Sequence, residues 1–348
     1  MPQADAKYTI AIDAMGGDGA PQIVMDGLGL IAGELEKKRI SLLIFGPGET
    51  LAPLVAKRPA LVRISKIVDA RDVVSGEDKP SRVIRSGRDT SMWRAIEAVR
   101  EHKADAVVSA GNTGCLMGIS KLLIKMIEGI TRPAITTLVP NEKGGLTTML
   151  DLGANAECDE FNIAQFAVIG SLYSRLVAGV RKPKVGILNI GSESGKGPEY
   201  LGRAAELVAA DASKLDFEYI GFVEGDDIFK GKADVIAADG FSGNIALKTL
   251  EGTAKFIAGM IRKLFKGSLL GAISYLLLRG RINEFRKTAD PRNYNGAVFL
   301  GLDGIVVKSH GGTDAKGYAS AVNYASVMVA HDFNAALKRA LAKKGAAK

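Results

Sequence analysis

The sequence predicts an α/β protein with a mostly parallel β-sheet, and three observations support this fold class. Short apolar runs alternate with longer stretches of helical periodicity, as in sheets whose strands are joined by covering helices. Gly-rich or polar turns follow most of these runs. With 348 residues, 47% of them hydrophobic, the chain can bury a large core. The expected strands are residues 8–14, 41–45, 106–110, 147–152, 185–190, 235–239 and 304–308.

We expect one large α/β domain over residues 1–335 that contains the active site, followed by a basic tail over residues 336–348. The first segment, Met1 to Lys7, is polar and lacks the pattern of a secretory signal, so we expect a cytoplasmic protein. The two cysteines, Cys115 and Cys158, are far apart and outside any Cys/His cluster. We therefore expect neither a disulfide framework nor a metal site.

The first expected strand runs into an acid, two glycines and a second acid: Asp13, Gly16, Gly17 and Asp18. Glycine is favoured where the backbone adopts positive φ or lies close to a ligand. Pro21 fits the first turn of a following helix. This pattern indicates either a ligand-binding loop or a tight strand-to-helix turn.

A second loop, Ser109 to Gly114, lies between an expected strand and a helix beginning near Cys115. Free N–H groups at a helix start, together with Asn112 and Thr113, suit a phosphate group. A plain N-cap is the alternative. The loop lacks the lysine and spacing of a nucleotide P-loop, and no Gly-x-Gly-x-x-Gly follows the first run, so a nucleotide is disfavoured.

Three later loops also carry polar groups. Lys196 stands between glycines after one expected strand, where its ammonium could meet a phosphate or an oxyanion. Asn244 enters a helix after the next strand and either reaches the substrate or caps that helix. His310 begins a Gly-rich turn and is either a proton-transfer group or a structural imidazole. Loops at the carboxyl ends of parallel strands share one edge, so we expect them to converge on one site.

The formal net charge of +8 is concentrated in one segment. Residues 255–287 carry a net charge of +7, and the rest of the chain carries only +1. Residues 251–287 show helical periodicity up to Gly267 and then an apolar stretch over 269–278, too short to span a membrane. We expect a basic amphipathic hairpin that contacts a membrane surface, a twin subunit or an acidic partner protein. The alternative is an ordinary core helix pair.

Six motifs together resemble the bacterial phosphate acyltransferase family of phospholipid synthesis, in the family's order and over nearly the whole chain. They are Asp13 to Asp18, Ser109 to Gly114, Asp151 to Asn155, Asn189 to Gly197, Asp239 to Asn244, and His310 to Gly312.

The resemblance implies a Rossmann-like α/β/α sandwich, related to phosphotransacetylases and isocitrate-dehydrogenase-like folds, that acts as a homodimer. It implies that inorganic phosphate attacks a fatty acyl thioester on acyl carrier protein. The acyl phosphate formed would supply a membrane glycerol-3-phosphate acyltransferase. No metal, nucleotide or other cofactor is implied, because the phosphopantetheine belongs to the carrier substrate, and no nucleic acid is expected as a partner.

By this resemblance we expect catalytic roles for Lys196, Asn244 and, in support, His310. The role of the two acids Asp13 and Asp18 stays open, because carboxylates are unfavourable beside phosphate; they orient either a lysine or the glycine loop. Expected substrate-binding residues are Asp13, Gly16, Gly17, Asp18, Ser109, Gly111, Asn112, Thr113, Gly114, Asn155, Gly191 and Gly243.

Two other functions remain open. A phosphotransacetylase-like enzyme would use the same nucleophile with acyl-coenzyme A. A non-catalytic membrane-associated scaffold would account for the basic hairpin but leaves the glycine loops unexplained. A dehydrogenase is disfavoured because the dinucleotide fingerprint is missing.

Overall fold

The computed structural model describes residues 7–266, 277–281, 292 and 295–346. Within these residues an eleven-stranded sheet runs in the order β3-β2-β1-β4-β11-β10-β5-β6-β9-β7-β8. The strands are β1 (Tyr8–Asp13), β2 (Ile40–Gly46), β3 (Ser65–Asp69), β4 (Ala106–Ser109), β5 (Ala134–Pro140), β6 (Leu146–Leu150), β7 (Lys184–Leu188), β8 (Glu218–Val223), β9 (Val235–Ala237), β10 (Ala297–Leu300) and β11 (Ile305–Lys308).

The sheet is parallel in two blocks, which confirms the predicted fold class. One block is β3-β2-β1-β4-β11 and the other is β6-β9-β7-β8. Between them, β10 pairs antiparallel with β11 and β5, and β5 pairs antiparallel with β6. The second block therefore runs opposite to the first, and sequence patterning did not predict this reversal.

Four strands were not among the expected apolar runs: β3, β5, β8 and β10. The two edge strands β3 and β8 have mixed burial rather than a continuous apolar run. Strand β5 contains two threonines and ends at Pro140, and β10 has only four residues. Edge position, internal hydroxyls and short length each weaken the signal of a buried strand.

Helices cover both faces of the sheet because successive side chains on each strand point in opposite directions. Ile10 and Ile12 of β1 pack in a core with α1, α7 and α12, whereas Ala11 packs in a second core with α5 and α6. The helices are α1 (Gln22–Lys37), α2 (Gly48–Ala56), α3 (Pro59–Ile64), α4 (Pro80–Ser86), α5 (Ser91–Arg100), α6 (Thr113–Leu123), α7 (Glu160–Leu176), α8 (Glu199–Ala212), α9 (Asp227–Lys230), α10 (Gly240–Lys266), α12 (Ala315–Ala330) and α13 (Phe333–Ala346).

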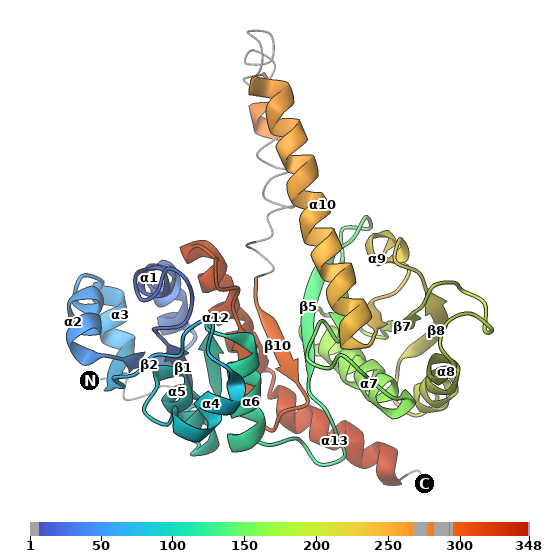
Figure 1. Ribbon diagram of the computed structural model, residues 1–348, viewed down its shortest axis with the longest axis horizontal. Helices are drawn as coiled ribbons and strands as arrows, with labels where there is room; N and C mark the ends of the chain where they lie inside the picture. The colour runs from blue at the N-terminus through green and yellow to red at the C-terminus, as the bar shows by residue number, and fades with distance from the viewer. Residues whose placement is uncertain (1–6, 267–276, 282–291, 293–294, 347–348) are drawn as a thin grey trace.

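Figure 1 shows α1 to α6 and α12 on one side of β10, and α7 to α9 on the other. Helix α10 begins beside β5 and extends well beyond the sheet, so most of its length lies outside the body of the molecule (Figure 1). Its side chains Phe256, Ile257, Met260 and Ile261 are exposed. No helix in the described part of the chain is long and apolar enough to cross a membrane.

The predicted hairpin over residues 251–287 is described only in part. Its first half is the outer part of α10, and residues 277–281 are helical. Residues 267–276 and 282–287 lie outside the described residues. The predicted boundary after residue 335 falls within α13, where Phe333 and Leu337 are buried in the core.

Candidate active site

One cluster of predicted site residues forms where β1, β4 and β11 end. Strand register places Asp13, Ser109 and Lys308 in one row across these three strands. The hydroxyl of Ser109 donates to one Asp13 oxygen at 2.6 Å, and that of Ser91 donates to the other at 2.7 Å. Burial raises the pKa of the Asp13 carboxyl, while the hydroxyl hydrogen bonds oppose this shift. Asp13 is therefore an internal anchor for the loops around it.

The glycines of the first loop are required by close packing. A Cβ on Gly16 would lie 2.6 Å from both the Gly111 nitrogen and an Asp13 oxygen. Gly17 has φ of +102°, a conformation that disfavours side chains. The next residue, Asp18, is exposed, and its N–H donates to the Gly311 carbonyl at 3.0 Å. The loops after β1, β4 and β11 thus meet at one place.

The N-cap interpretation of Asn112 is confirmed. Its side-chain oxygen accepts from the Cys115 N–H at 3.1 Å. Its amide donates to the carbonyl oxygens of Gly76 at 2.8 Å and Asp78 at 3.1 Å. Thr113, in the first turn of α6, is exposed and takes no part in this cap, so it is available to a ligand.

Lys308 belongs to this cluster, although sequence reasoning did not select it. The side chain is partly buried, and its ammonium donates to the carbonyl oxygens of Ala110, at 3.2 Å, and of Ser309. Burial lowers the pKa of this ammonium to about 8, partly offset by the charges of Asp13 and Asp18. The available signal was a lysine ending a buried strand immediately before the His310 loop.

The His310 side chain lies on the rim of the cluster. Its Nδ1 accepts from the Gly312 N–H at 3.2 Å, so the neutral ring carries its proton on Nε2. The residue is exposed. The imidazole orders its own turn through Nδ1 and leaves Nε2 for another partner. The structure is therefore consistent with both a structural role and a role in proton transfer.

A second cluster forms where β6 and β9 end. The buried Asp151 carboxylate accepts from the backbone N–H groups of Ile135 at 2.9 Å, Ala154 at 3.0 Å and Asn155 at 2.8 Å. The Asn155 amide donates to Asp151 at 2.8 Å and to the Pro133 carbonyl at 2.7 Å. Asn155 therefore has its amide occupied within the protein and orders the loop.

The start of α10 lies directly on this loop. The Asn155 carbonyl accepts from the Gly240 N–H at 2.8 Å. Asp239 accepts from the Ser242 N–H at 2.8 Å and from the Tyr200 hydroxyl at 3.0 Å. Asp239 thus provides the helix cap, and the capping alternative for Asn244 is wrong because Asn244 already lies inside α10.

Asn244 and Lys196 present polar groups that the protein itself does not use. Asn244 is exposed, and its amide makes no hydrogen bond with any described side chain or backbone group. Lys196 is exposed in the loop between β7 and α8 and forms no ion pair within the described ranges. Its backbone carbonyl accepts from the Asn189 amide at 2.9 Å, which orders the loop. Gly191, in the same loop, is buried.

The structure therefore groups the predicted residues into two clusters. The first holds Asp13 to Asp18, Ser109 to Gly114 and His310, and the second holds Asn155, Gly243 and Asn244. Tyr200 connects the second cluster to α8, which follows the Lys196 loop. Between the described residues no hydrogen bond or ion pair joins the two clusters. Because β6 and β9 run opposite to β1, β4 and β11, the argument that all these loops share one edge of the sheet does not extend across the two blocks, and their convergence on one substrate stays a prediction.

The chemistry available in these clusters is binding and charge stabilisation. In the portion of the chain described, no three residues among His, Cys, Asp and Glu are grouped to hold a metal ion. Neither thiol is activated: burial raises the pKa of Cys115, and it raises that of Cys158 to about 11. An exposed ammonium, a free amide and helix N–H groups suit an anionic reactant and a developing oxyanion.

Comparison with known proteins gives consistent matches along the chain. A family model described as "Fatty acid synthesis protein" matches residues 8–336. The phosphate acyltransferase of Rhodospirillum rubrum is 47% identical over 340 residues, covering 97% of this chain and 95% of that protein. The phosphate acyltransferase of Rhodospirillum centenum is 48% identical over 344 residues, covering 98% of this chain and 95% of that protein.

Two solved structures with the same fold are phosphotransacetylases. The enzyme from Streptococcus pyogenes has a TM-score of 0.62 and 16% identity, with coverage of 93% of this chain and 94% of that one. The EutD phosphotransacetylase from Staphylococcus aureus has a TM-score of 0.59 and 16% identity, with coverage of 94% of both chains. At this identity the likeness shows the fold alone.

The contact between α10 and the Asp151 loop can be tested by changing Gly243 to alanine. A Cβ at Gly243 would overlap the Asp151 carbonyl oxygen. We expect Gly243→Ala to lower the free energy of unfolding by about 1–3 kcal/mol, as overpacking does. Gly252→Ala is the matched control, because a Cβ there meets nothing within 4 Å in the same helix. That control should be neutral or stabilising by up to about 1 kcal/mol. Equal unfolding midpoints for the two variants would show that the contact is not tight.

Proposed function

Because the chain belongs to the phosphate acyltransferase family, we propose that it transfers a fatty acyl group from acyl carrier protein to inorganic phosphate. Acyl transfer with phosphate as the acceptor is supported by two phosphate acyltransferases, which are 47% and 48% identical to this chain over nearly its full length. The carrier protein as donor is the further part of the proposal. The product is an acyl phosphate for phospholipid synthesis.

The reaction needs little covalent help from the protein. A phosphate oxygen attacks the thioester carbonyl carbon, and a C–O bond forms as the carbonyl becomes an oxyanion. The C–S bond then breaks, and the thiolate leaves and takes a proton. Phosphate is already nucleophilic near neutral pH, so positioning and oxyanion stabilisation are the main demands. The two cysteines fit this scheme, because thiols with raised pKa are poor nucleophiles.

We assign the free polar groups to these demands. The unpaired Lys196 ammonium and Asn244 amide stabilise the thioester oxyanion, since neither is used by the fold. The first turn of α6, with Thr113 exposed, receives the phosphate dianion. His310, whose Nδ1 is taken by its own turn, donates a hydrogen bond from Nε2–H to the departing thiolate, which takes its proton from water.

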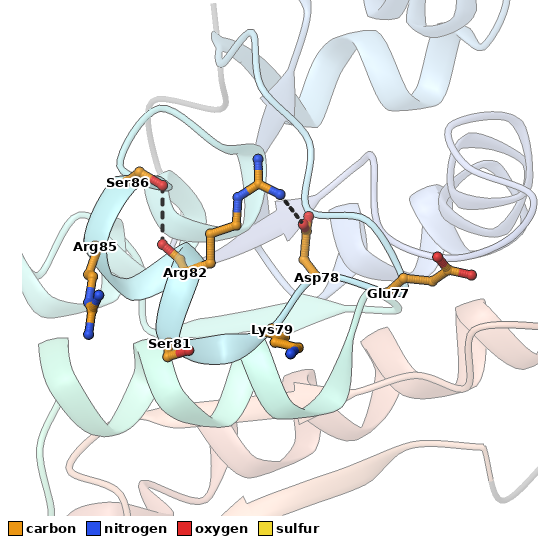
Figure 2. Close-up of a pocket in the computed structure, with 7 residues that line it drawn as sticks. All are labelled: Glu77, Asp78, Lys79, Ser81, Arg82, Arg85 and Ser86. Atoms are coloured by element: carbon orange, nitrogen blue, oxygen red, sulfur yellow. Dashed lines mark hydrogen bonds and ion pairs between the residues drawn. The ribbon is translucent and has the colours of Figure 1, made fainter.

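Support for a carrier-protein donor comes from the surface beside the first cluster. The α4 basic surface consists of the exposed side chains of Lys79, Arg82, Arg85 and Arg88. Three of these cations, Lys79, Arg82 and Arg85, line a hollow of about 480 Å³, drawn in Figure 2, together with the acids Glu77 and Asp78, and Arg82 forms an ion pair with Asp78. An acidic carrier protein is complementary to such a surface.

The α4 basic surface lies next to the turn assigned to phosphate. The segment before α4 receives two hydrogen bonds from the Asn112 amide, at the carbonyl groups of Gly76 and Asp78. Pro80 lies against Gly114, where a Cβ would be 3.0 Å from the proline ring. A carrier docked on α4 would therefore deliver its pantetheine thioester at the edge of the first cluster.

We further propose a cytoplasmic homodimer that associates peripherally with the inner face of the plasma membrane. The support is the outer part of α10, where Phe256, Ile257 and Met260 are exposed. Such a face is typical of contact with a second subunit or a lipid surface. The location suits delivery of acyl phosphate to a membrane glycerol-3-phosphate acyltransferase.

The donor is tested by incubating the protein and phosphate with a long-chain acyl carrier protein or, in parallel, with acyl-coenzyme A. We expect phosphate-dependent thiol release and acyl phosphate formation with the carrier substrate. Turnover with coenzyme A alone would favour a phosphotransacetylase-like enzyme. Turnover with neither donor would favour the scaffold function.

Removing the Lys196 ammonium tests its contact with the oxyanion. We expect Lys196→Ala to lower kcat by on the order of 10², the loss typical of one oxyanion-stabilising group. The control is Lys182→Ala, which removes an exposed ammonium on the segment leading into β7. A kcat near that of the control would remove Lys196 from the mechanism.

Charge reversal on α4 tests where the carrier docks. We expect Arg82→Glu with Arg85→Glu to raise KM for the acyl carrier substrate at least about tenfold, because repulsion replaces attraction. KM for acyl-coenzyme A should change little in any residual reaction. Arg181→Glu with Lys182→Glu makes the same change in net charge at exposed residues far from α4 in the chain. Equal KM values for the two double variants would place the carrier elsewhere.

A further inference from the structure

Lys308 has a specific position that the proposed acyl transfer does not use. It is the last residue of β11, level with Ser109 of β4 and, one strand further, with Asp13 of β1. Its ammonium points to backbone oxygens rather than to solvent, donating to the carbonyls of Ala110 and Ser309. A lysine side chain held this way loses much rotamer freedom and hydration, so the position needs a compensating role.

The Ala110–Gly111 peptide is held from both sides. Its carbonyl oxygen accepts from the Lys308 ammonium at 3.2 Å, and its N–H donates to the Ser109 hydroxyl at 3.0 Å. Ser109 in turn donates to Asp13. The turn that leads into α6 is thus fixed by a chain of groups that ends in one ammonium and one carboxylate.

The charges around this turn conflict with phosphate binding unless a cation is present. Asp13 and Asp18 both face Lys308 and act electrostatically on it. A phosphate dianion brought beside two carboxylates would be repelled. The His310 ring lies two residues along the same loop, and the buried Tyr318 hydroxyl of α12 faces Asp13. Within this set Lys308 supplies a partly buried ammonium beside the two acids.

We propose that Lys308 is the positioning residue for phosphate: it holds the Ala110–Gly111 turn ahead of α6 and offsets the charges of Asp13 and Asp18. This role rests on the proposed transfer of the acyl group to phosphate. It also resolves the question that the sequence left open about the two acids. Asp13 orients the loop through Ser109, and both acids hold the lysine in place electrostatically.

Steady-state kinetics with varied phosphate separates this role from a general structural one. We expect Lys308→Met to raise KM for phosphate at least about tenfold, as loss of a charge-assisted hydrogen bond does. KM for the acyl donor should change much less. Lys308→Arg keeps the charge and should restore most of the phosphate affinity. Lys66→Met, at an exposed position on β3, is the control for loss of a lysine.

The pH profile gives a second readout that stability does not affect. Lysine is cationic below its pKa, and burial lowers the pKa of Lys308 to about 8. We therefore expect kcat/KM for phosphate in the wild type to fall above about pH 8. The fall should move to higher pH in Lys308→Arg and be absent in Lys308→Met. Tyr318 does not produce this fall, because burial raises its pKa well above the usual value.

A double variant tests the charge balance directly. In Lys308→Met the negative charge of Asp13 is no longer offset by an ammonium. Adding Asp13→Asn to this variant removes that negative charge. Part of the phosphate affinity should return. Two independent structural defects would instead make the double variant weaker than either single one.

Failure of this inference can be distinguished from failure of the proposed function. If the wild type forms no acyl phosphate with either donor, the proposed function fails, and protection by inorganic phosphate against thermal unfolding still tests Lys308. If the wild type is active but Lys308→Met keeps the wild-type phosphate KM and the fall above pH 8, the inference is overturned. Should Lys308→Met not fold, an unshifted pH profile in Lys308→Arg overturns it equally.

Discussion

The buried Asp13 carboxylate is the constraint on which the first cluster depends. Two hydroxyls, from Ser91 and Ser109, donate to its oxygens, and removing the Ser109 hydroxyl would leave the buried Oδ2 without its donor, whereas Oδ1 also accepts from the Met15 N–H. Because Ser109 also accepts from the Gly111 N–H, the strand end, the turn and the start of α6 are fixed together. Gly16 then has no room for a side chain between Asp13 and Gly111. One internal carboxylate thus fixes the loops after β1 and β4 relative to each other.

The second cluster uses the same device with different partners. Asp151 gathers backbone N–H groups from Ile135, Ala154 and Asn155, and Asn155 connects this loop to the first residue of α10. In both clusters a buried acid, Asp13 or Asp151, has its oxygens hydrogen-bonded within the protein. The groups available to a substrate come from exposed neighbouring residues. This division explains why an enzyme of anionic reactants carries aspartates at the ends of its strands: Asp13 and Asp151 order the donors of their loops.

The sequence was sufficient for the fold class and for most loop positions, and insufficient for assigning roles within the loops. Continuous apolar runs and the Gly-rich turns after them predicted strands such as β1, β4 and β7, because both are local patterns. The antiparallel centre could not be predicted, since strand direction depends on pairing across distant segments. Asn112 and Asn244 both follow a Gly-rich turn near the start of a helix, so the sequence did not distinguish them. In the structure the Asn112 side chain caps α6, whereas the Asn244 side chain makes no hydrogen bond with the described residues. Lys308 was missed because its role depends on Ala110, which is brought beside it only by the sheet.

Helix α10 connects the second cluster to the most exposed part of the molecule. Its 27 residues span about 40 Å at 1.5 Å per residue. Charges at its outer end are several screening lengths from Asn244 at physiological ionic strength, so they cannot act on the site through space. A partner or lipid surface bound there can influence the site by moving the helix. The inner end allows little movement, because Gly243 and Gly240 lie directly against the Asp151–Asn155 loop. Any displacement of α10 must therefore move Asn244 and that loop together. Binding at the outer end of α10 is thus coupled to the chemistry at Asn244 through the contacts of Gly240 and Gly243.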